Sequence, residues 1–329
     1  MSGATIPYHL RQNKAVDRYA FMELLSKVDR FCDVSKYQYV GFGGHSLEDF
    51  KYIHNRFGIS SMTSIERDEE VYKRQQFNLP HNCINCLLQD SNDFVRDFIR
   101  EERTIIWLDY TKPAQLGSQI AQFQSIIDRF SSLDIIKITL NAHASSYVEA
   151  NKTVQPNDTW NARIKDLEKK LGNELFPFAD ISPDMMTARG FPNAIHLIVK
   201  YAANLAMRGD LDIYFQPLTS FSYNDGQEML TVTGILLEKT QSESFFNKTG
   251  IDQWELGNVD WKEPTRIDMP DLTIKERMHI DTFLPNFSAD LVHEKLGFLI
   301  NQKESISLEM LKTYVLFYRQ SPYFSRIFV

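Results

Sequence analysis

A glycine-rich turn and a carboxylate further along the chain have the residue types and spacing of a nucleotide-type cofactor site. The turn reads Gly-Phe-Gly-Gly at positions 41–44, and Glu66 follows at close to the separation of roughly 20 residues found in such sites. Glycine tolerates positive φ and lets backbone N–H groups approach a ligand closely. A carboxylate that closes the next strand can accept hydrogen bonds from ribose hydroxyls. The residues predicted to bind the cofactor at these two points are Gly41, Phe42, Gly43, Gly44, Glu66 and Arg67.

A third candidate binding point follows the apolar run at 83–88. Gln89, Asp90 and Ser91 come directly after that run. In a doubly wound sheet a polar residue at this place lies near the base of a bound nucleotide. We therefore expect Asp90 and Ser91 to contact an adenine ring.

Two apolar runs end in side chains that could move a proton. The run at 104–110 closes with Asp109 and Tyr110, and the run at 134–143 closes with Asn141 and His143. A carboxylate or an imidazole can act as a general base, so Asp109 and His143 are candidates for that role. Tyr110, which closes the same run as Asp109, is the third catalytic candidate. Asp109 could instead bind an amino group of the cofactor or cap a helix, and His143 could be a hydrogen-bonded structural histidine. Asn141 and Tyr110 would orient the acceptor or the cofactor.

Alternating strands and helices are needed to bring these residues together. Five strands are predicted between residues 37 and 143, and helices are predicted after the first, second and fourth of them. Continuous apolar strands such as 104–110 are typical of central strands in a parallel sheet that is buried on both faces. Because parallel strands end at one edge, all the candidate residues should meet there.

The later part of the chain favours S-adenosylmethionine over NAD(P) as the cofactor. A complete dinucleotide fingerprint needs a third glycine, and Ser46 stands in its place. After a polar segment at 150–180, which we interpret as an insertion or lid, and a helix at 193–208, residues 211–239 form a predicted hairpin around an Asn-Asp-Gly turn. A closing antiparallel hairpin after five α/β units is the topology of class I methyltransferases, whereas dinucleotide oxidoreductases continue with parallel units. The cofactor predicted is S-adenosylmethionine.

Composition and charge limit the partners. The 329 residues suffice for one large α/β domain with an appendage, and the net charge of −7 gives no support to nucleic-acid binding. The three cysteines cannot form a disulfide framework, which indicates a reduced, cytoplasmic protein. Cys83 and Cys86 form a single CxxC without a second half, so two ordinary thiols are a better interpretation than zinc or redox chemistry. No apolar run reaches about 18 residues, so no membrane span is expected.

Both ends of the chain carry helices outside the predicted sheet. Residues 1–36 form an arm and an amphipathic helix whose Arg11, Lys14 and Arg18 either lie at a solvated helix entrance or capture an anionic group. The cofactor-binding domain is predicted at 37–240. Residues 241–329 form a linker and a small helical module in which basic and acidic residues balance from 270 onward. Packing or homo-oligomerisation is therefore favoured over docking of nucleic acid.

Several motifs together resemble one family. VGFGG, SIERDEE, IIWLDY and ITLNAH, with the opening LRQNKAVDR, are similar to a group of bacterial proteins labelled O-methyltransferases, within the class I S-adenosylmethionine-dependent superfamily. The resemblance covers residues 8–240. It implies a Rossmann-like, seven-stranded α/β sheet with a closing antiparallel hairpin. It also implies that the glycine turn holds the methionine part of the cofactor, Glu66 the ribose and Asp90 the adenine, with Asp109 and Tyr110 at the methyl-transfer site.

The sequence departs from the motifs of two well-known branches of that superfamily. LDYTKP stands where amino-methylating enzymes carry Asn or Asp followed by Pro-Pro and an aromatic residue. The arrangement of acids found in metal-dependent catechol-type enzymes is also not evident, so no metal is expected. The function predicted is O-methylation of a small-molecule or protein acceptor. A catalytically inactive cofactor-binding sensor or partner subunit, and a nucleic-acid methyltransferase, are the alternatives.

Overall fold

The computed structural model describes residues 11–149, 155–207, 209 and 212–322. Residues 1–10 of the predicted arm, 150–154 of the predicted insertion, positions 208, 210 and 211, and residues 323–329 of the predicted helical module lie outside these ranges. Contacts divide the chain into two compact units. One contains residues 22–222 and 227–265, and the other contains residues up to 21, 223–226 and 266 onward.

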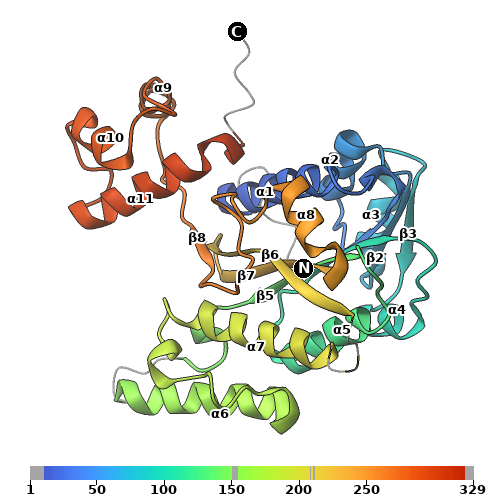
Figure 1. The fold of residues 1–329 in the computed structure, drawn as a ribbon. Coiled ribbons are helices and arrows are strands. Elements are labelled where there is room, and N and C mark those ends of the chain that lie inside the picture. Colours follow the sequence, from blue (N-terminus) through green and yellow to red (C-terminus); the bar gives the residue numbers. More distant parts are fainter. Residues whose placement is uncertain (1–10, 150–154, 208, 210–211, 323–329) are drawn as a thin grey trace. The chain divides into compact units, whose positions relative to one another are not determined.

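An eight-stranded sheet is the framework of the protein (Figure 1). Its order is β3-β2-β1-β4-β5-β7-β6-β8. Strands β1 to β5 are parallel, and β7 is antiparallel to β5. This is the predicted doubly wound sheet with its closing hairpin, and the short β8 is added beyond the predicted seven strands. The strands are β1 (Gln38–Gly41), β2 (Ser61–Glu66), β3 (Ile84–Leu88), β4 (Thr104–Asp109), β5 (Ile135–Asn141), β6 (Ile213–Asn224), β7 (Glu228–Glu238) and β8 (Thr265–Ile267).

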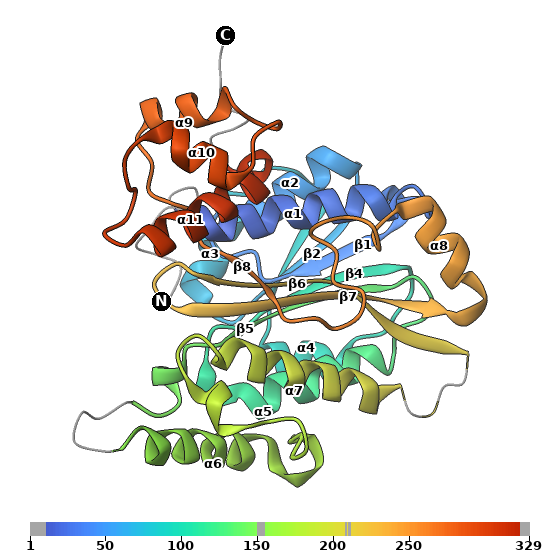
Figure 2. The same cartoon turned by 60° about the vertical axis from the view of Figure 1, so that its left-hand side comes forward.

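Helices cover one face of this sheet with an apolar core. Ile106 and Leu108 of β4 and Ile136 and Ile138 of β5 point into that core, as alternation along a strand requires. Helices α5 and α7 supply the opposing side chains, and α6 packs outside them (Figure 2). The helices of the sheet unit are α2 (Glu48–Phe57), α3 (Glu69–Phe77), α4 (Ser91–Asp97), α5 (Leu116–Ile127), α6 (Pro156–Leu175), α7 (Phe191–Ala206) and α8 (Ser242–Thr249).

The opposite face of the central strands is unusually polar for a buried surface. Lys137 on β5 is 1% exposed, and its Nζ lies 4.3 Å from the centre of the Trp107 ring on β4. The Trp107 indole Nε1 donates to Thr139 Oγ1 over 3.0 Å. A cation over an aromatic ring is stabilised by the ring quadrupole, which offsets part of the cost of burying the ammonium group. The apolar character of both strands in the sequence does not indicate this buried polar pair.

The start of α1 (Gln12–Val28) is fixed by side chains and not by solvent. In the unit that contains residues 11–21, Lys14 and Arg18 are 7% and 2% exposed, so a solvated helix entrance is wrong. The Lys14 N–H donates to Asp225 Oδ2 over 2.7 Å. Asn13 donates from Nδ2 to the Asn224 carbonyl and accepts from the Met269 N–H, both over 2.9 Å. Asp225 therefore acts as a remote cap for the first turn of α1.

The last part of the chain forms three helices, as predicted. These are α9 (Ile274–Asp281), α10 (Ala289–Leu296) and α11 (Glu304–Phe317). The predicted capping box between Thr273 and Glu276 is present at the start of α9. The Tyr314 hydroxyl of α11 donates to Asp281 Oδ1 over 2.7 Å and ties the helices together. Among the residues described, no helix is long and apolar enough to cross a bilayer.

Candidate functional site

The glycine turn leaves β1 at Gly41 and passes very close to its neighbours. A Cβ on Gly43 would lie 2.4 Å from Leu47 Cδ2 and 2.6 Å from Ser64 Oγ, so a larger residue there requires these side chains or the turn to move. The Gly43 N–H donates to Ser64 Oγ over 3.2 Å, which joins the turn to β2. Gly44 has φ of +51°, a value that glycine adopts without strain.

Helix α3 holds the same turn from the other side. Gln75 Nε2 donates to the Gly44 carbonyl, and Asn78 Nδ2 donates to the His45 carbonyl, each over 2.8 Å. Gln75 is 0% exposed. Sequence reasoning missed both residues, because in a helix as polar as α3 no pattern separates a buried glutamine from a solvated one.

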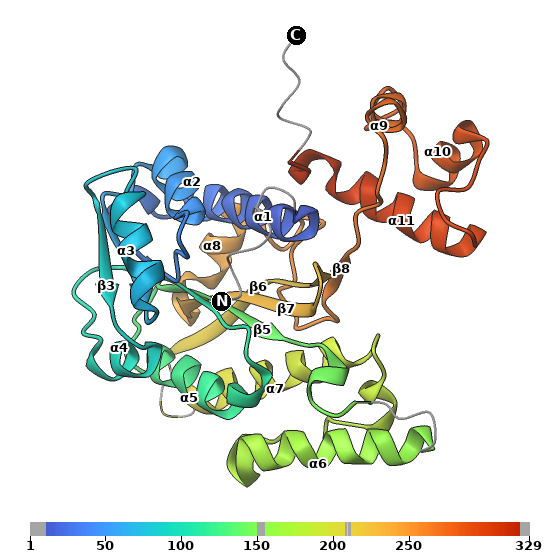
Figure 3. The same cartoon turned by 180° about the vertical axis from the view of Figure 1, so that it is seen from behind.

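The acid after β2 and the acid after β3 lie close together, as predicted. Glu66 Oε1 accepts hydrogen bonds from the N–H groups of Arg67 and Asp68, each over 2.9 Å. Asp90 is the N-cap of α4 and accepts the Asn92 N–H over 2.9 Å. Arg67 Nη1 lies 4.0 Å from Asp90 Oδ2, and both side chains are more than a third exposed, so their ion pair contributes little to stability. Figure 3 shows α3 and α4 beside β3.

Tyr110, a catalytic candidate, is enclosed between the ends of β1 and α4. Its ring meets Phe42 edge to face with 5.4 Å between centroids, and its hydroxyl donates to Gln122 Oε1. Burial raises the pKa of the Tyr110 phenol, and a hydrogen bond with Ser91 lowers it in part. The structure thus brings Tyr110 into contact with Phe42 and Ser91.

The other catalytic candidates end β4 and β5, which are adjacent strands. Asp109 is half-buried and pairs in register with Thr139. His143 is half-buried just beyond β5, and its backbone N–H donates to Asn141 Oδ1 over 3.0 Å. Asn141 is 1% exposed and donates from Nδ2 to Gln227 Oε1 over 2.7 Å. Asn141 therefore orders the segment that carries His143.

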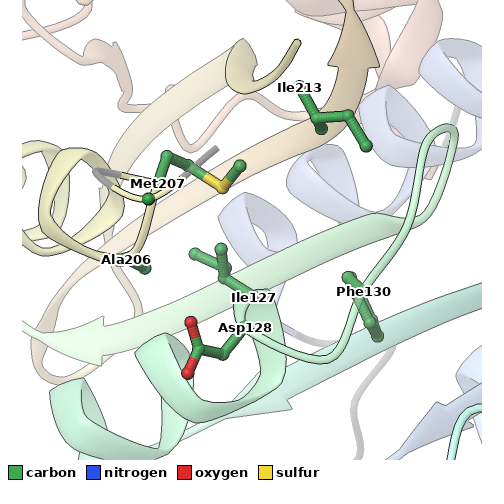
Figure 4. A pocket seen from close by; sticks show the side chains of 7 residues that line it. Ile127, Asp128, Phe130, Ala206, Met207 and Ile213 are labelled. Atoms are coloured by element: carbon green, nitrogen blue, oxygen red, sulfur yellow. The ribbon is translucent and has the colours of Figure 1, made fainter. Parts of the chain in front are cut away.

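Other features of the described residues lie apart from this edge. No three His, Cys, Asp or Glu side chains in the described ranges gather as a metal site would require. Cys83 Sγ lies 3.6 Å from His54 Nδ1, and Cys86 is buried. A cavity of about 530 Å³ is lined by Ile127, Asp128, Phe130, Ala206, Met207, Gly209 and Ile213 (Figure 4). It lies where α5 and α7 end and β6 begins, at the edge opposite the carboxyl ends of the parallel strands.

The fold and the site define a doubly wound α/β protein with a nucleotide-type binding edge. A family described as "Putative O-methyltransferase" matches residues 6–329, nearly the whole chain. The protein belongs to this family, which confirms the resemblance seen in the sequence.

More distant comparisons add little. The plantazolicin methyltransferase BpumL, solved with S-adenosylhomocysteine, is 11% identical, with a TM-score of 0.39 over 67% of this chain and 84% of that chain. The N-methyltransferase NodS of Bradyrhizobium japonicum is 9% identical, with a TM-score of 0.39 over 68% and 97%. No curated protein sequence matches the chain.

Proposed function

We propose that the protein is an S-adenosylmethionine-dependent methyltransferase that acts on an oxygen atom of a small-molecule or protein acceptor. The observation that carries the proposal is the joint placement of the glycine turn and Glu66 at the carboxyl ends of neighbouring strands β1 and β2. The sheet closes with the hairpin typical of class I methyltransferases, and the family match points to the same activity.

The residues present fit that cofactor. Among the described residues, Glu66 uses Oε1 for two backbone N–H groups, and Oε2 has no hydrogen-bond partner, so one oxygen is available to ribose hydroxyls. Ser46 Oγ is enclosed and also lacks a partner within the described ranges, beside the turn that would hold the methionine part. Asp90 keeps Oδ2 on the side of Arg67, where an adenine amino group could be bound.

The cofactor, when bound, supplies a methyl group on a positively charged sulfur, which leaves as the neutral thioether. The chain must hold the acceptor oxygen in line with that methyl group. Positioning of this kind is worth about 7–11 kcal/mol in favourable cases. It must also accept the proton that the hydroxyl loses as the new C–O bond forms, a contribution of roughly 10²–10⁴-fold. Asp109 and His143 are the proposed acceptors of that proton, since both end adjacent central strands.

Tyr110 has a different proposed role. Its hydroxyl is buried and already donates to Gln122, and its raised pKa keeps it protonated at neutral pH. A phenol in that state is poorly suited to remove a proton. We assign Tyr110 to shaping the cofactor side of the site through its contacts with Phe42 and Ser91.

Transfer of a labelled methyl group tests this function. The protein would be incubated with S-adenosylmethionine labelled in its methyl group and with separated small-molecule, protein and nucleic-acid fractions of a cell extract. Label in the small-molecule or protein fraction supports the proposal. Cofactor binding without transfer to any fraction would indicate a catalytically inactive binding module, and label confined to nucleic acid would contradict the proposed acceptor class.

A further inference from the structure

The carbonyl groups of Gly44 and His45 are both held on the side of helix α3. Gln75 of α3 donates a side-chain amide hydrogen to the Gly44 carbonyl over 2.8 Å. Asn78, the C-cap of the same helix, donates one to the His45 carbonyl over 2.8 Å. Gln75 is 0% exposed, so its amide is fixed by the surrounding packing. The turn is thus held at two consecutive peptide groups.

Because the peptide group is planar, the direction of each carbonyl fixes the direction of the N–H group that follows it. In a trans peptide the C=O and N–H bonds point in opposite directions. The Gly44 carbonyl shares a peptide plane with the His45 N–H, and the His45 carbonyl shares one with the Ser46 N–H. With both carbonyls turned toward α3, both N–H groups point away from it. Neither N–H has a hydrogen-bond acceptor within the described ranges.

Two N–H groups of successive residues that are both turned away from the same helix form a site suited to an anion. Ser46 adds an enclosed hydroxyl oxygen that has no partner among the residues described. Helix α2 begins two residues later at Glu48, so its N-terminus follows these N–H groups closely in the chain. An anion here is expected to be small, because the turn is closed by Leu47 and Ser64 on its inner side.

We propose that Gln75 and Asn78 are positioning residues that aim the N–H groups of His45 and Ser46 at the carboxylate of the cofactor's amino-acid part. This inference rests on the proposed function. It gives a role to Gln75, a buried residue that lies outside the glycine motif. The adenosine part of the cofactor lies with Glu66 and Asp90 and does not depend on these two side chains.

A pair of ligands separates the two parts of the site. S-adenosylhomocysteine has the amino-acid carboxylate, whereas 5′-methylthioadenosine keeps the adenosine and sulfur and lacks it. Affinity for both would be measured by calorimetry, with displacement of S-adenosylhomocysteine for the weaker ligand, on the wild type, Gln75→Met and Asn78→Ala. We expect each variant to bind S-adenosylhomocysteine about tenfold more weakly, with affinity for 5′-methylthioadenosine changed less than about twofold.

A matched control tests for a general effect on the fold. Gln124 of α5 donates from Nε2 to the Ala202 carbonyl of α7 over 3.1 Å. Gln124→Met therefore removes the same kind of hydrogen bond away from the turn and should bind both ligands as the wild type does. Asn78 is only half-buried, and Asn78→Ala keeps the test available if Gln75→Met does not fold. Equal weakening of both ligands, or no weakening of either, would overturn the inference. Absence of S-adenosylhomocysteine binding by the wild type would instead overturn the proposed function.

Discussion

Asn141, at the end of β5, is joined to Gln227, at the start of the returning strand β7, by a hydrogen bond of 2.7 Å between Nδ2 and Oε1. Asn141 Oδ1 accepts a hydrogen bond from the His143 N–H over 3.0 Å. The backbone carbonyl of Asn141 accepts one from the Tyr147 hydroxyl over 2.8 Å. One buried asparagine therefore links the parallel part of the sheet to its closing hairpin. It also fixes the loop that carries a proposed catalytic histidine.

Replacing Asn141 should destabilise the protein. Asn141→Ala removes a buried amide and leaves the His143 N–H without its acceptor, at a cost of about 1–3 kcal/mol in the free energy of unfolding. A double-mutant cycle with Gln227→Ala should show a coupling of about 1 kcal/mol. Urea denaturation monitored by circular dichroism measures both. The control is Asn193→Ala, whose amide makes an exposed contact of 3.3 Å with Glu263 and should change stability by less than about 0.5 kcal/mol.

Gly43 should not tolerate even alanine. The added Cβ would meet Leu47 and Ser64 at distances that real side chains do not show, so these buried side chains or the turn must move. We expect a loss of about 1–3 kcal/mol in the free energy of unfolding and loss of measurable S-adenosylhomocysteine binding. Gly58→Asn is the control, because Gly58 has φ of +71° and nothing near its Cβ position, and asparagine tolerates that conformation. Wild-type affinity in Gly43→Ala would show that the close packing is not needed.

Once a labelled acceptor has been found, a methyl-transfer assay should show different effects on kcat for substitutions of Asp109 and Tyr110. Asp109→Asn removes a proposed proton acceptor and should lower kcat by roughly 10²–10⁴-fold. Tyr110→Phe removes only the hydroxyl bonded to Gln122 and should lower kcat by less than about tenfold, with a stability loss of about 1 kcal/mol. A larger loss in Tyr110→Phe than in Asp109→Asn would reverse the two assignments.

His196 should make the stability of the protein depend on pH. It lies 1% exposed in α7, with 5.3 Å between its ring and that of Trp261. Burial lowers its pKa from 6.5 to about 4, with a smaller contribution from the charge of Lys200. Between these values the unfolded chain binds a proton that the native protein does not. The free energy of unfolding should therefore fall as the pH decreases through this range.

The size of this effect can be measured by denaturation at pH 7 and pH 4.5. The shift corresponds to about 3 kcal/mol if it is fully realised, at roughly 1.4 kcal/mol for each pKa unit. His196→Phe, which keeps a ring against Trp261, should reduce the slope of stability against pH. His279→Gln, at an exposed position, should leave the slope unchanged. An unchanged slope in His196→Phe would show that other groups control the acid response.

Much of the architecture could be predicted from the sequence, because it depends on local patterns. Apolar runs such as 104–110, the turn around Gly226 and the capping box at Thr273 each specify an element within a few residues. The helices α4 and α8 were missed. Each is only seven or eight residues long, too short for a clear helical period.

The contacts within the site could be predicted less well, because they depend on residues far apart in the chain. The strand ends placed Glu66 near Asp90, which is a consequence of topology alone. Nothing local showed that Gln75 reaches Gly44 or that Asn141 reaches Gln227. No motif showed that the Tyr110 hydroxyl, predicted to orient the acceptor or the cofactor, donates to Gln122 on α5.

Calorimetric titration of the wild type with S-adenosylhomocysteine, beside Glu66→Ala and the control Glu70→Ala, tests the central claim most directly. Glu70 is an exposed acid on α3 that pairs with Lys73 over 2.8 Å, so its loss should leave binding unchanged. The account predicts binding by the wild type and by Glu70→Ala. It predicts affinity about 10- to 100-fold weaker in Glu66→Ala, which loses charge-assisted hydrogen bonds to ribose. Absence of binding by the wild type, or equal binding by all three proteins, would contradict it.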